Sequence, residues 1–281
     1  MPTIAIVSRK GGSGKSTLAT NLAAYFALNS MPVTLGDLDH QQSMRVWLRR
    51  RPSAAPVINS WVGDTHGAVR PPAGTTNLIL DTPGGLHGLA LAKVAMVADA
   101  IFIPVSGSLF DRESASDCWA ELRQHPRVKN GRCAVASIGT RLDARTHAEE
   151  VTRDWSASVG LYFIGCLRTS QLYVRAVENG LSIFDMPLSA SAADREQWQP
   201  VVAWLGEHVF HGSTVAQASA PHIPNHASRA APIAMASASP SSVILARMTQ
   251  VANVAPASAP EKSTTVSGIA RWMPSIFRRK A

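Results

Sequence analysis

The chain has 281 residues, of which 46% are hydrophobic and 16% charged, enough apolar material for one large α/β domain or two small ones. This composition excludes a chain that is disordered throughout, and the net charge of +8 favours an acidic partner such as nucleic acid or an anionic membrane. Three cysteines are too few for a disulfide framework. Neither a signal peptide nor a membrane-spanning segment is predicted, so a cytoplasmic location is expected.

The charge is unevenly distributed along the chain. Residues 1–212 carry 20 basic and 18 acidic side chains, whereas residues 213–281 carry seven basic and one acidic. Residues 213–260 are dominated by Ala, Ser and Pro, which offer little apolar surface to offset the entropy lost when a backbone is ordered. We therefore predict a folded domain over 1–212, a flexible linker over 213–260 and a disordered C-terminal tail that ends in a basic amphipathic segment, 261–281.

Within residues 1–212, short β-rich runs alternate with longer helical patterns. Strands are predicted at Thr3–Ser8, Pro32–Asp37, Asn77–Asp81, Ala100–Val105, Cys133–Ile138 and Leu161–Leu167. Helices are predicted at Lys15–Leu28, Ser43–Arg51, Leu89–Val97, Asp111–Gln124 (with Asp111 as its N-cap), His147–Ser158, Leu172–Glu178 and Ala192–His208. This alternation predicts an α/β fold with a doubly wound, mostly parallel sheet that carries helices on both faces. Ligands of such sheets bind at the carboxyl ends of the strands.

A glycine-rich segment, Arg9–Thr17 (RKGGSGKST), joins the first predicted strand to the first predicted helix. Glycines allow backbone amides to point at phosphate groups, and the N-terminus of the helix adds partial positive charge. Lys15 adds a full positive charge and Ser16 offers a hydroxyl to Mg²⁺. The residues expected to hold phosphates are Gly11, Gly12, Ser13, Gly14, Lys15, Ser16 and Thr17.

The string K-G-G-S-G-K-S-T resembles the deviant Walker A motif of the ParA/MinD family of P-loop ATPases, in which the first glycine of the ordinary motif, here Arg9, is not required. Two further segments match that family in order. Leu35–Ser43 (LGDLDHQQS) is similar to its D-x-D-P-Q segment, and Asn77–Gly85 (NLILDTPGG) is similar to its Walker B strand. The resemblance covers about residues 1–210 and is strongest to short plasmid partition proteins of the ParF type.

The resemblance implies that the chain binds ATP and Mg²⁺ and hydrolyses ATP. By position, the catalytic residues would be Lys10, Lys15 and Asp39, and the residues at the metal would be Ser16, Asp37 and Asp81. In the family, the lysine matched by Lys10 reaches across a nucleotide-sandwich dimer to the partner's ATP, and the residue matched by Asp39 positions the attacking water. Asp37 and Asp81 would support Mg²⁺ through its waters.

Two residues of the second segment depart from the family pattern. His40 stands where the family usually has proline, so the backbone there lacks the fixed φ of proline. Gly36 is unusual inside a strand and is expected to loosen it.

The family's function is an ATP-driven switch in plasmid or chromosome segregation. The resemblance implies a homodimer formed on ATP, binding to non-specific DNA of the nucleoid, and slow hydrolysis stimulated by a ParB-like or small centromere-binding adaptor. One alternative is a MinD-like membrane-cycling ATPase that positions other machinery, or a ParA relative that serves conjugation. Another is a metabolic amide-forming ligase that shares the nucleotide-binding fold, although no second substrate site is legible in the sequence.

Several arginines are candidates for contact with DNA phosphates: Arg45, Arg49, Arg50 and Arg51 beside the Asp39 loop, and Arg168, Arg175 and Arg195 farther along. The alternative is a solvated arginine face, with Trp47 packed on the core. The pairs His208/His211 and His222/His226 have helical spacing, but no carboxylate or cysteine completes a metal site beside them.

The end of the sequence has an apolar stripe of helical period, formed by Ile269, Trp272, Met273, Ile276 and Phe277. Basic residues fill the remainder, a pattern typical of binding to an anionic membrane through residues 269–280. Pro274 argues against one continuous helix. A docking peptide for a protein, an extra DNA anchor and a solvated tail are the alternatives.

Overall fold

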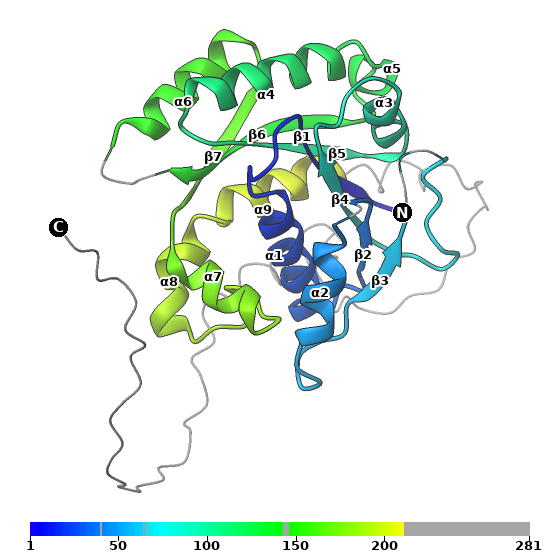
Figure 1. Ribbon diagram of the computed structural model, residues 1–281, viewed down its shortest axis with the longest axis vertical. Coiled ribbons are helices and arrows are strands. Elements are labelled where there is room, and N and C mark those ends of the chain that lie inside the picture. The colour runs from blue at the N-terminus through cyan, green and yellow to red at the C-terminus, as the bar shows by residue number, and fades with distance from the viewer. Residues whose placement is uncertain (40, 64, 66, 143–145, 211–281) are drawn as a thin grey trace, which may run out of the picture.

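The computed structural model describes residues 1–39, 41–63, 65, 67–142 and 146–210, which form a single seven-stranded sheet between two layers of helices (Figure 1). The strand order is β3-β2-β4-β1-β5-β6-β7, and every neighbouring pair is parallel. The strands are β1 (Thr3–Ser8), β2 (Thr34–Asp37), β3 (Asn59–Val62), β4 (Leu78–Gly84), β5 (Ala100–Val105), β6 (Ala134–Leu142) and β7 (Tyr162–Arg168). The expected doubly wound parallel sheet is therefore confirmed.

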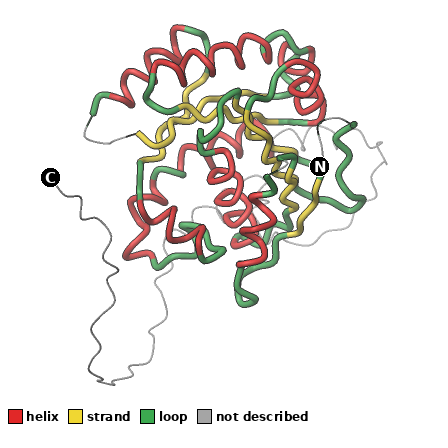
Figure 2. The backbone as a smooth tube through the Cα atoms, in the orientation of Figure 1, coloured by secondary structure: helices red, strands yellow, loops and turns green. Residues whose placement is uncertain are grey.

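The helices divide between the two faces of the sheet, and Figure 2 shows the strands running between them. One face carries α3 (Gly88–Val97), α4 (Leu109–Leu122), α5 (Pro126–Lys129) and α6 (Ala148–Ser158). The other carries α1 (Lys15–Leu28), α2 (Ser43–Arg50), α7 (Gln171–Glu178), α8 (Leu188–Glu196) and α9 (Gln199–Leu205), and a π-helical turn, Gly206–Phe210, follows α9.

The central strand β1 supplies both hydrophobic cores. Ile4 and Ile6 belong to the core under α1, whereas Ala5 and Val7 belong to the core under α3 and α4. All four side chains are fully buried, because successive side chains of a strand point to opposite faces and both faces are covered. This double burial explains why β1 appears in the sequence as one continuous apolar run.

The edge strand β3 was not predicted, and it changes the interpretation of Gly36. Gly36 lies opposite Trp61 of β3 and Leu80 of β4. A Cβ atom at Gly36 would lie 2.7 Å from the Leu80 side chain and 3.0 Å from the Trp61 ring. The missing side chain at Gly36 therefore makes the space in which Trp61 and Leu80 pack, and the expectation that Gly36 loosens its strand stays a prediction.

Several helix boundaries differ from those expected, and two of the differences change how a residue is interpreted. Helix α4 begins at Leu109, and its N-cap is Ser108, whose hydroxyl accepts a hydrogen bond from the Asp111 amide. Asp111 therefore lies in the first turn and not at the cap. The single helix predicted over 192–208 is divided, because α8 ends at Glu196 and α9 begins again with Pro200 in its first turn.

The predicted linker 213–260 and basic segment 261–281 lie outside the described residues, as do His40, His211, His222 and His226. The predictions for them stay predictions. Within the described ranges, no helix is both long and apolar enough to cross a membrane.

Candidate functional site

The loop between β1 and α1 has a backbone that only glycine adopts readily. Gly12 and Gly14 have φ angles of +72° and +94°, in the left-handed region. The loop also lies close to the end of β4, since a Cβ atom at Gly84 would be 3.2 Å from the Gly11 Cα atom. The glycines thus hold the loop in a narrow space at the carboxyl ends of β1 and β4.

The two lysines of this loop have different surroundings. Lys15 is 6% exposed and donates to the Lys10 carbonyl oxygen at 3.4 Å. Burial lowers the pKa of Lys15, and the negative charges of Asp81 and Asp39 oppose that shift. Lys10 is about half exposed, and its Nζ atom forms an ion pair with Asp111 at the start of α4. Lys15 is therefore fixed inside the loop, whereas Lys10 reaches out of it.

The carboxyl group of Asp81 lies beneath the loop, where it is fully buried. The Ser16 hydroxyl donates to Asp81 Oδ2 at 2.7 Å. Burial raises the pKa of Asp81 to about 7, although the Ser16 hydrogen bond and the Lys15 charge act in the opposite direction. A cation bound beside Asp81 would favour the ionised carboxylate and lower this pKa again.

Asp37 lies opposite Asp81 in the register of the neighbouring strands β2 and β4. Its two oxygens accept hydrogen bonds from the amides of Asp39, at 3.1 Å, and Met44, at 3.2 Å. Burial raises the pKa of Asp37, and these backbone bonds lower it in part. Asp37 thus fixes the start of α2 and the position of Asp39.

The residues present fit phosphate and a hard divalent cation. Asp81 Oδ1 and Ser13 Oγ are buried and have no hydrogen-bond partner among the described residues. Mg²⁺ prefers oxygen ligands and keeps several of its waters, and Asp81 lies beside the Ser16 hydroxyl, where a phosphate loop holds the metal of its nucleotide, whereas the Ser13 hydroxyl is available to a phosphate oxygen. No cluster of three or more His, Cys, Asp or Glu side chains suited to a metal ion occurs in the described part of the chain.

A polar cavity of about 470 Å³ brings most of the predicted residues together. Its lining consists of Gly11, Gly12, Ser13, Gly14, Lys15, Ser16, Thr17, Asp39, Gln41, Ser43, Pro83, Gly84 and Arg141. The whole predicted phosphate loop and Asp39 thus share one site, with Asp81 directly behind Ser16. Lys10 is absent from this lining because its amine is engaged by Asp111.

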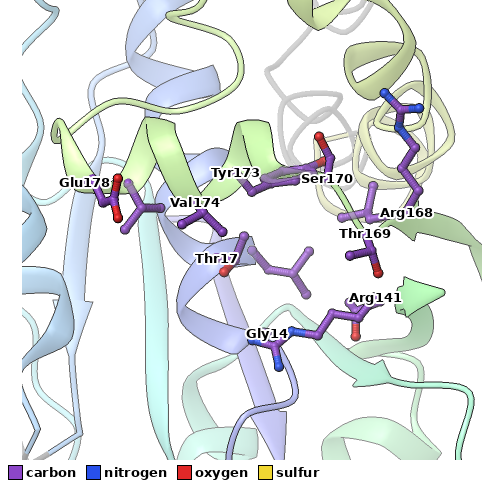
Figure 3. Close-up of a pocket in the computed structure, with 13 residues that line it drawn as sticks. Gly14, Thr17, Arg141, Arg168, Thr169, Ser170, Tyr173, Val174 and Glu178 are labelled. Atoms are coloured by element: carbon purple, nitrogen blue, oxygen red, sulfur yellow. The ribbon is translucent and has the colours of Figure 1, made fainter. Parts of the chain in front are cut away.

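A second cavity, of about 530 Å³ and mostly apolar, adjoins the first (Figure 3). Gly14, Thr17 and Arg141 line both cavities. Helix α7 and the ends of β6 and β7 form the remaining walls, and Figure 3 shows Tyr173 and Val174 of α7 facing Thr17. The polar phosphate site and the apolar cavity therefore lie side by side, with these three residues between them.

Two residues of these cavities were missed by the sequence analysis. Thr140 donates from its hydroxyl to the Ser13 carbonyl oxygen at 2.9 Å, which ties the loop to β6. Arg141 follows in a left-handed conformation, with φ +56°, where the register between β6 and β7 shifts. The sequence offered two signals for them: polar residues at the carboxyl end of a buried strand, and the similarity of Ser137–Asp143 (SIGTRLD) to short partition ATPases.

The candidate DNA-contacting arginines fall into two groups. Arg51 pairs with Asp185 at 3.2 Å, and Arg168 pairs with Asp194 at 2.9 Å. Arg195 is buried and donates to three backbone carbonyl oxygens. These three side chains hold the fold together, and the exposed arginines of the set are Arg45, Arg49, Arg50 and Arg175.

Trp47 belongs to the core, as the structural alternative predicted. Its ring is 2% exposed, and its indole nitrogen donates to the Leu181 carbonyl oxygen at 3.1 Å. The exposed arginines of α2 are therefore carried on a helix that is firmly packed against the chain that follows α7.

The parallel sheet and the glycine loop that enters α1 together define a P-loop nucleoside triphosphatase fold. Residues 4–183 match the CobQ/CobB/MinD/ParA nucleotide binding domain, and the chain belongs to this family. The ParA/MinD resemblance is thereby confirmed.

Individual relatives agree with this assignment. Protein ParA of Rhizobium radiobacter is 43% identical over 200 residues, which cover 67% of this chain and 78% of that protein. Maintenance of carboxysome distribution protein A of Gloeobacter kilaueensis is 29% identical over 187 residues, covering 64% and 82%. A plasmid partition protein of Borrelia burgdorferi, solved with bound AMPPNP, has the same fold with a TM-score of 0.55 at 16% identity, covering 72% and 99%.

Proposed function

We propose that this chain is an ATP-dependent switch that dimerises on ATP, binds non-specific DNA and hydrolyses ATP slowly when a partner protein stimulates it. Its task would be plasmid or chromosome partition on the nucleoid. The observation that carries this proposal is the polar cavity that brings the phosphate loop from Gly11 to Thr17 together with Asp39, with Asp81 bonded to Ser16 directly behind it. Membership of the ParA/MinD family and 43% identity to a ParA protein support it.

The phosphate groups of ATP would occupy the polar cavity. Backbone amides of residues 11–17 would donate to phosphate oxygens, and the buried amine of Lys15 would leave the Lys10 carbonyl for the phosphates. The Ser16 hydroxyl would ligate Mg²⁺, with Asp81 and Asp37 holding its waters. Bound Mg²⁺ neutralises charge that develops on the phosphate oxygens.

The nucleoside would occupy the apolar cavity that adjoins the loop. This recess has about 530 Å³ and is walled by Leu18, Leu167, Tyr173 and Val177. Pockets of this size and character suit a flat aromatic ring, and Arg141 and Thr169 at the rim offer polar contacts.

Hydrolysis requires a water in line with the bond between the γ-phosphorus and its bridging oxygen. Asp39 lies at the cavity wall, with its backbone fixed by Asp37 and its Oδ1 accepting from the Gln41 amide at 3.0 Å. We assign Asp39 the orientation of that water. The attack breaks the phosphorus–oxygen bond and releases ADP, inorganic phosphate and a proton. Lys10 would act across the dimer, on the phosphates of the partner protomer.

The exposed arginines of α2 and α7 would contact DNA phosphates. Arg45, Arg49, Arg50 and Arg175 are exposed, and α2 contains no acidic side chain. Phosphate contacts release counterions, so DNA binding should weaken steeply with salt. Partition ATPases are stimulated by an adaptor, and a ParB-like or small centromere-binding protein is the partner class that we propose.

A protein cargo is the second candidate, and the similarity to carboxysome distribution proteins favours it. In that case the same ATP switch would distribute a protein assembly in place of a plasmid. An anionic membrane, reached through residues 269–280, is the third possible anchor, and it rests on the sequence pattern alone.

The direct test of this function compares wild type with Lys15→Ala in phosphate release and DNA binding. Wild type should hydrolyse ATP slowly, faster with DNA and adaptor, and should bind DNA only with ATP. Lys15→Ala should lose hydrolysis by at least about 100-fold, because transition-state charge is left without its amine. A protein that binds DNA equally with and without nucleotide would contradict the switch.

A further inference from the structure

Two consecutive basic residues at the start of the phosphate loop, Arg9 and Lys10, form ion pairs with acidic residues of one helix, α4. Arg9 forms ion pairs with Glu121 and, at 3.7 Å, with Asp117. Lys10, the next residue, forms an ion pair with Asp111. All three acids belong to α4, which lies on the face of the sheet opposite α1. The position of Lys10 is therefore set by a helix that takes no part in the phosphate cavity.

Asp111 is the fixed member of its ion pair. Its Oδ2 atom accepts from the hydroxyls of Ser106 and, at 2.8 Å, Ser108. Its amide donates to Ser108 Oγ at 3.1 Å, within the cap of α4. The Asp111 side chain is 14% exposed and that of Lys10 is 46% exposed. When the pair separates, Lys10 is the side chain that moves, because Asp111 is held by three other bonds.

Lys10 has one amine, and two negatively charged groups compete for it. Within the protomer the amine binds the Asp111 carboxylate. In the dimer proposed above it would bind the phosphates of the partner's ATP, which carry more negative charge than one carboxylate. An amine that binds the partner's phosphates would leave Asp111, so each protomer would give up its internal ion pair when the dimer forms.

We propose that Asp111 is a positioning residue that retains Lys10 within its own protomer and so opposes dimer formation until a second ATP-loaded copy offers its phosphates. This inference rests on the proposed function, since it needs the nucleotide-dependent dimer. Asp111 sets the ATP and protein concentrations at which the switch closes, and it limits pairing between protomers that lack nucleotide.

The test measures the dimer dissociation constant by analytical ultracentrifugation, with Mg²⁺ and a non-hydrolysable ATP analogue. Asp111→Asn removes the charge and keeps an oxygen that accepts from Ser106 and Ser108. We expect the dissociation constant to fall by about 2- to 25-fold, because a partly exposed ion pair shifts an equilibrium by about 1.4- to fivefold and the dimer breaks two such pairs.

Asp117→Asn is the matched control, since it alters an exposed acid of the same helix that faces Arg9 and not Lys10. Its dissociation constant should stay within about twofold of wild type. The double variant Lys10→Ala/Asp111→Asn should dimerise like Lys10→Ala alone, because the effect of Asp111 acts through the Lys10 amine. Thermal unfolding of each variant checks the fold, and Asp111→Ser replaces Asp111→Asn if the latter unfolds.

The outcomes separate this inference from the proposed function. If wild type forms no dimer with the analogue, both are overturned. If wild type dimerises and Asp111→Asn has the wild-type dissociation constant, the role of Asp111 is wrong and the switch survives. If Asp111→Asn still tightens the dimer in the Lys10→Ala background, or if Asp117→Asn tightens it equally, the role proposed for Asp111 is also overturned.

Discussion

The buried carboxyl of Asp81 should make the metal-free protein less stable as the pH rises. Its pKa is raised by burial to about 7 from an ordinary value near 3.8, so the folded protein holds a proton that the unfolded chain releases. Between these two pH values the folded state binds more protons, and the free energy of unfolding therefore falls with rising pH. The stability is fully present below about pH 4 and is lost by about pH 7.

The size of this effect follows from the shift itself. Each pKa unit corresponds to about 1.4 kcal/mol, so a shift of about three pKa units lowers the free energy of unfolding by at most about 4 kcal/mol above pH 7. Asp81→Asn cannot ionise, and its oxygen still accepts from the Ser16 hydroxyl. Relative to wild type, the variant should gain about 2–3 kcal/mol in the free energy of unfolding between pH 5 and pH 8.

The assay is urea unfolding of both proteins in chelator, without nucleotide, at a series of pH values from 5 to 8. Adding Mg²⁺ and ATP should reverse the order at pH 8, because ligand bound only to folded wild type stabilises it by mass action. Stability curves that stay parallel between pH 5 and pH 8 would refute the account of Asp81. A variant that Mg²⁺ and ATP stabilise as much as wild type would remove Asp81 from the metal site.

Three further predictions concern residues outside the cavity. Arg51→Ala should lower the free energy of unfolding, measured in urea, by about 3 kcal/mol, because Asp185 is left buried without its ion-pair partner. Arg49→Ala should change it by less than about 0.5 kcal/mol. Equal effects would contradict the division of the arginines into one group that is paired within the fold and one that is exposed. Arg49→Ala should weaken ATP-dependent DNA binding for all sequences. The slope of log affinity against log salt concentration should become shallower by about the amount of one phosphate contact, and an unchanged slope would exclude Arg49 from the interface. The full chain should float with anionic vesicles and a chain ending at residue 260 should not, and equal flotation would end the membrane interpretation of residues 269–280.

The strands that are buried on both faces could be predicted from the sequence, because burial on both faces leaves a continuous apolar run such as Thr3–Ser8. Strand β3 was missed, because its four residues Asn59–Val62 lie at the sheet edge and are mostly exposed. Its two apolar residues, Trp61 and Val62, form neither a continuous apolar run nor an alternating pattern. Gly36 was the hint, since a glycine inside a buried strand marks a place where a neighbour approaches closely.

In the candidate site, too, residues that are contiguous in the sequence could be predicted, whereas contacts between distant parts of the chain could not. The phosphate loop is contiguous in sequence. Asp37 ends β2 and Asp81 lies opposite it inside β4, so their convergence follows from the pairing of neighbouring parallel strands. Arg141 enters the site through a register shift, and Asp111 reaches Lys10 through the packing of α4. No spacing in the sequence encodes either contact, because the partners are brought together by the tertiary fold.

The same limit applies to the arginines. Arg51 and Arg168 look like candidate phosphate contacts in the sequence, yet each is paired with an aspartate that is distant along the chain. Only the structure distinguishes a cation that binds its own fold from one that is free for a partner.

The central claim is that nucleotide joins two copies of this chain. It is tested most directly by the mass in solution, measured by light scattering after size-exclusion chromatography with Mg²⁺ and a non-hydrolysable ATP analogue. The account predicts a species of twice 29.9 kDa with the analogue, the monomer without it, and the monomer for Lys15→Ala under both conditions. A wild-type protein that remains at the monomer mass with saturating analogue would contradict it.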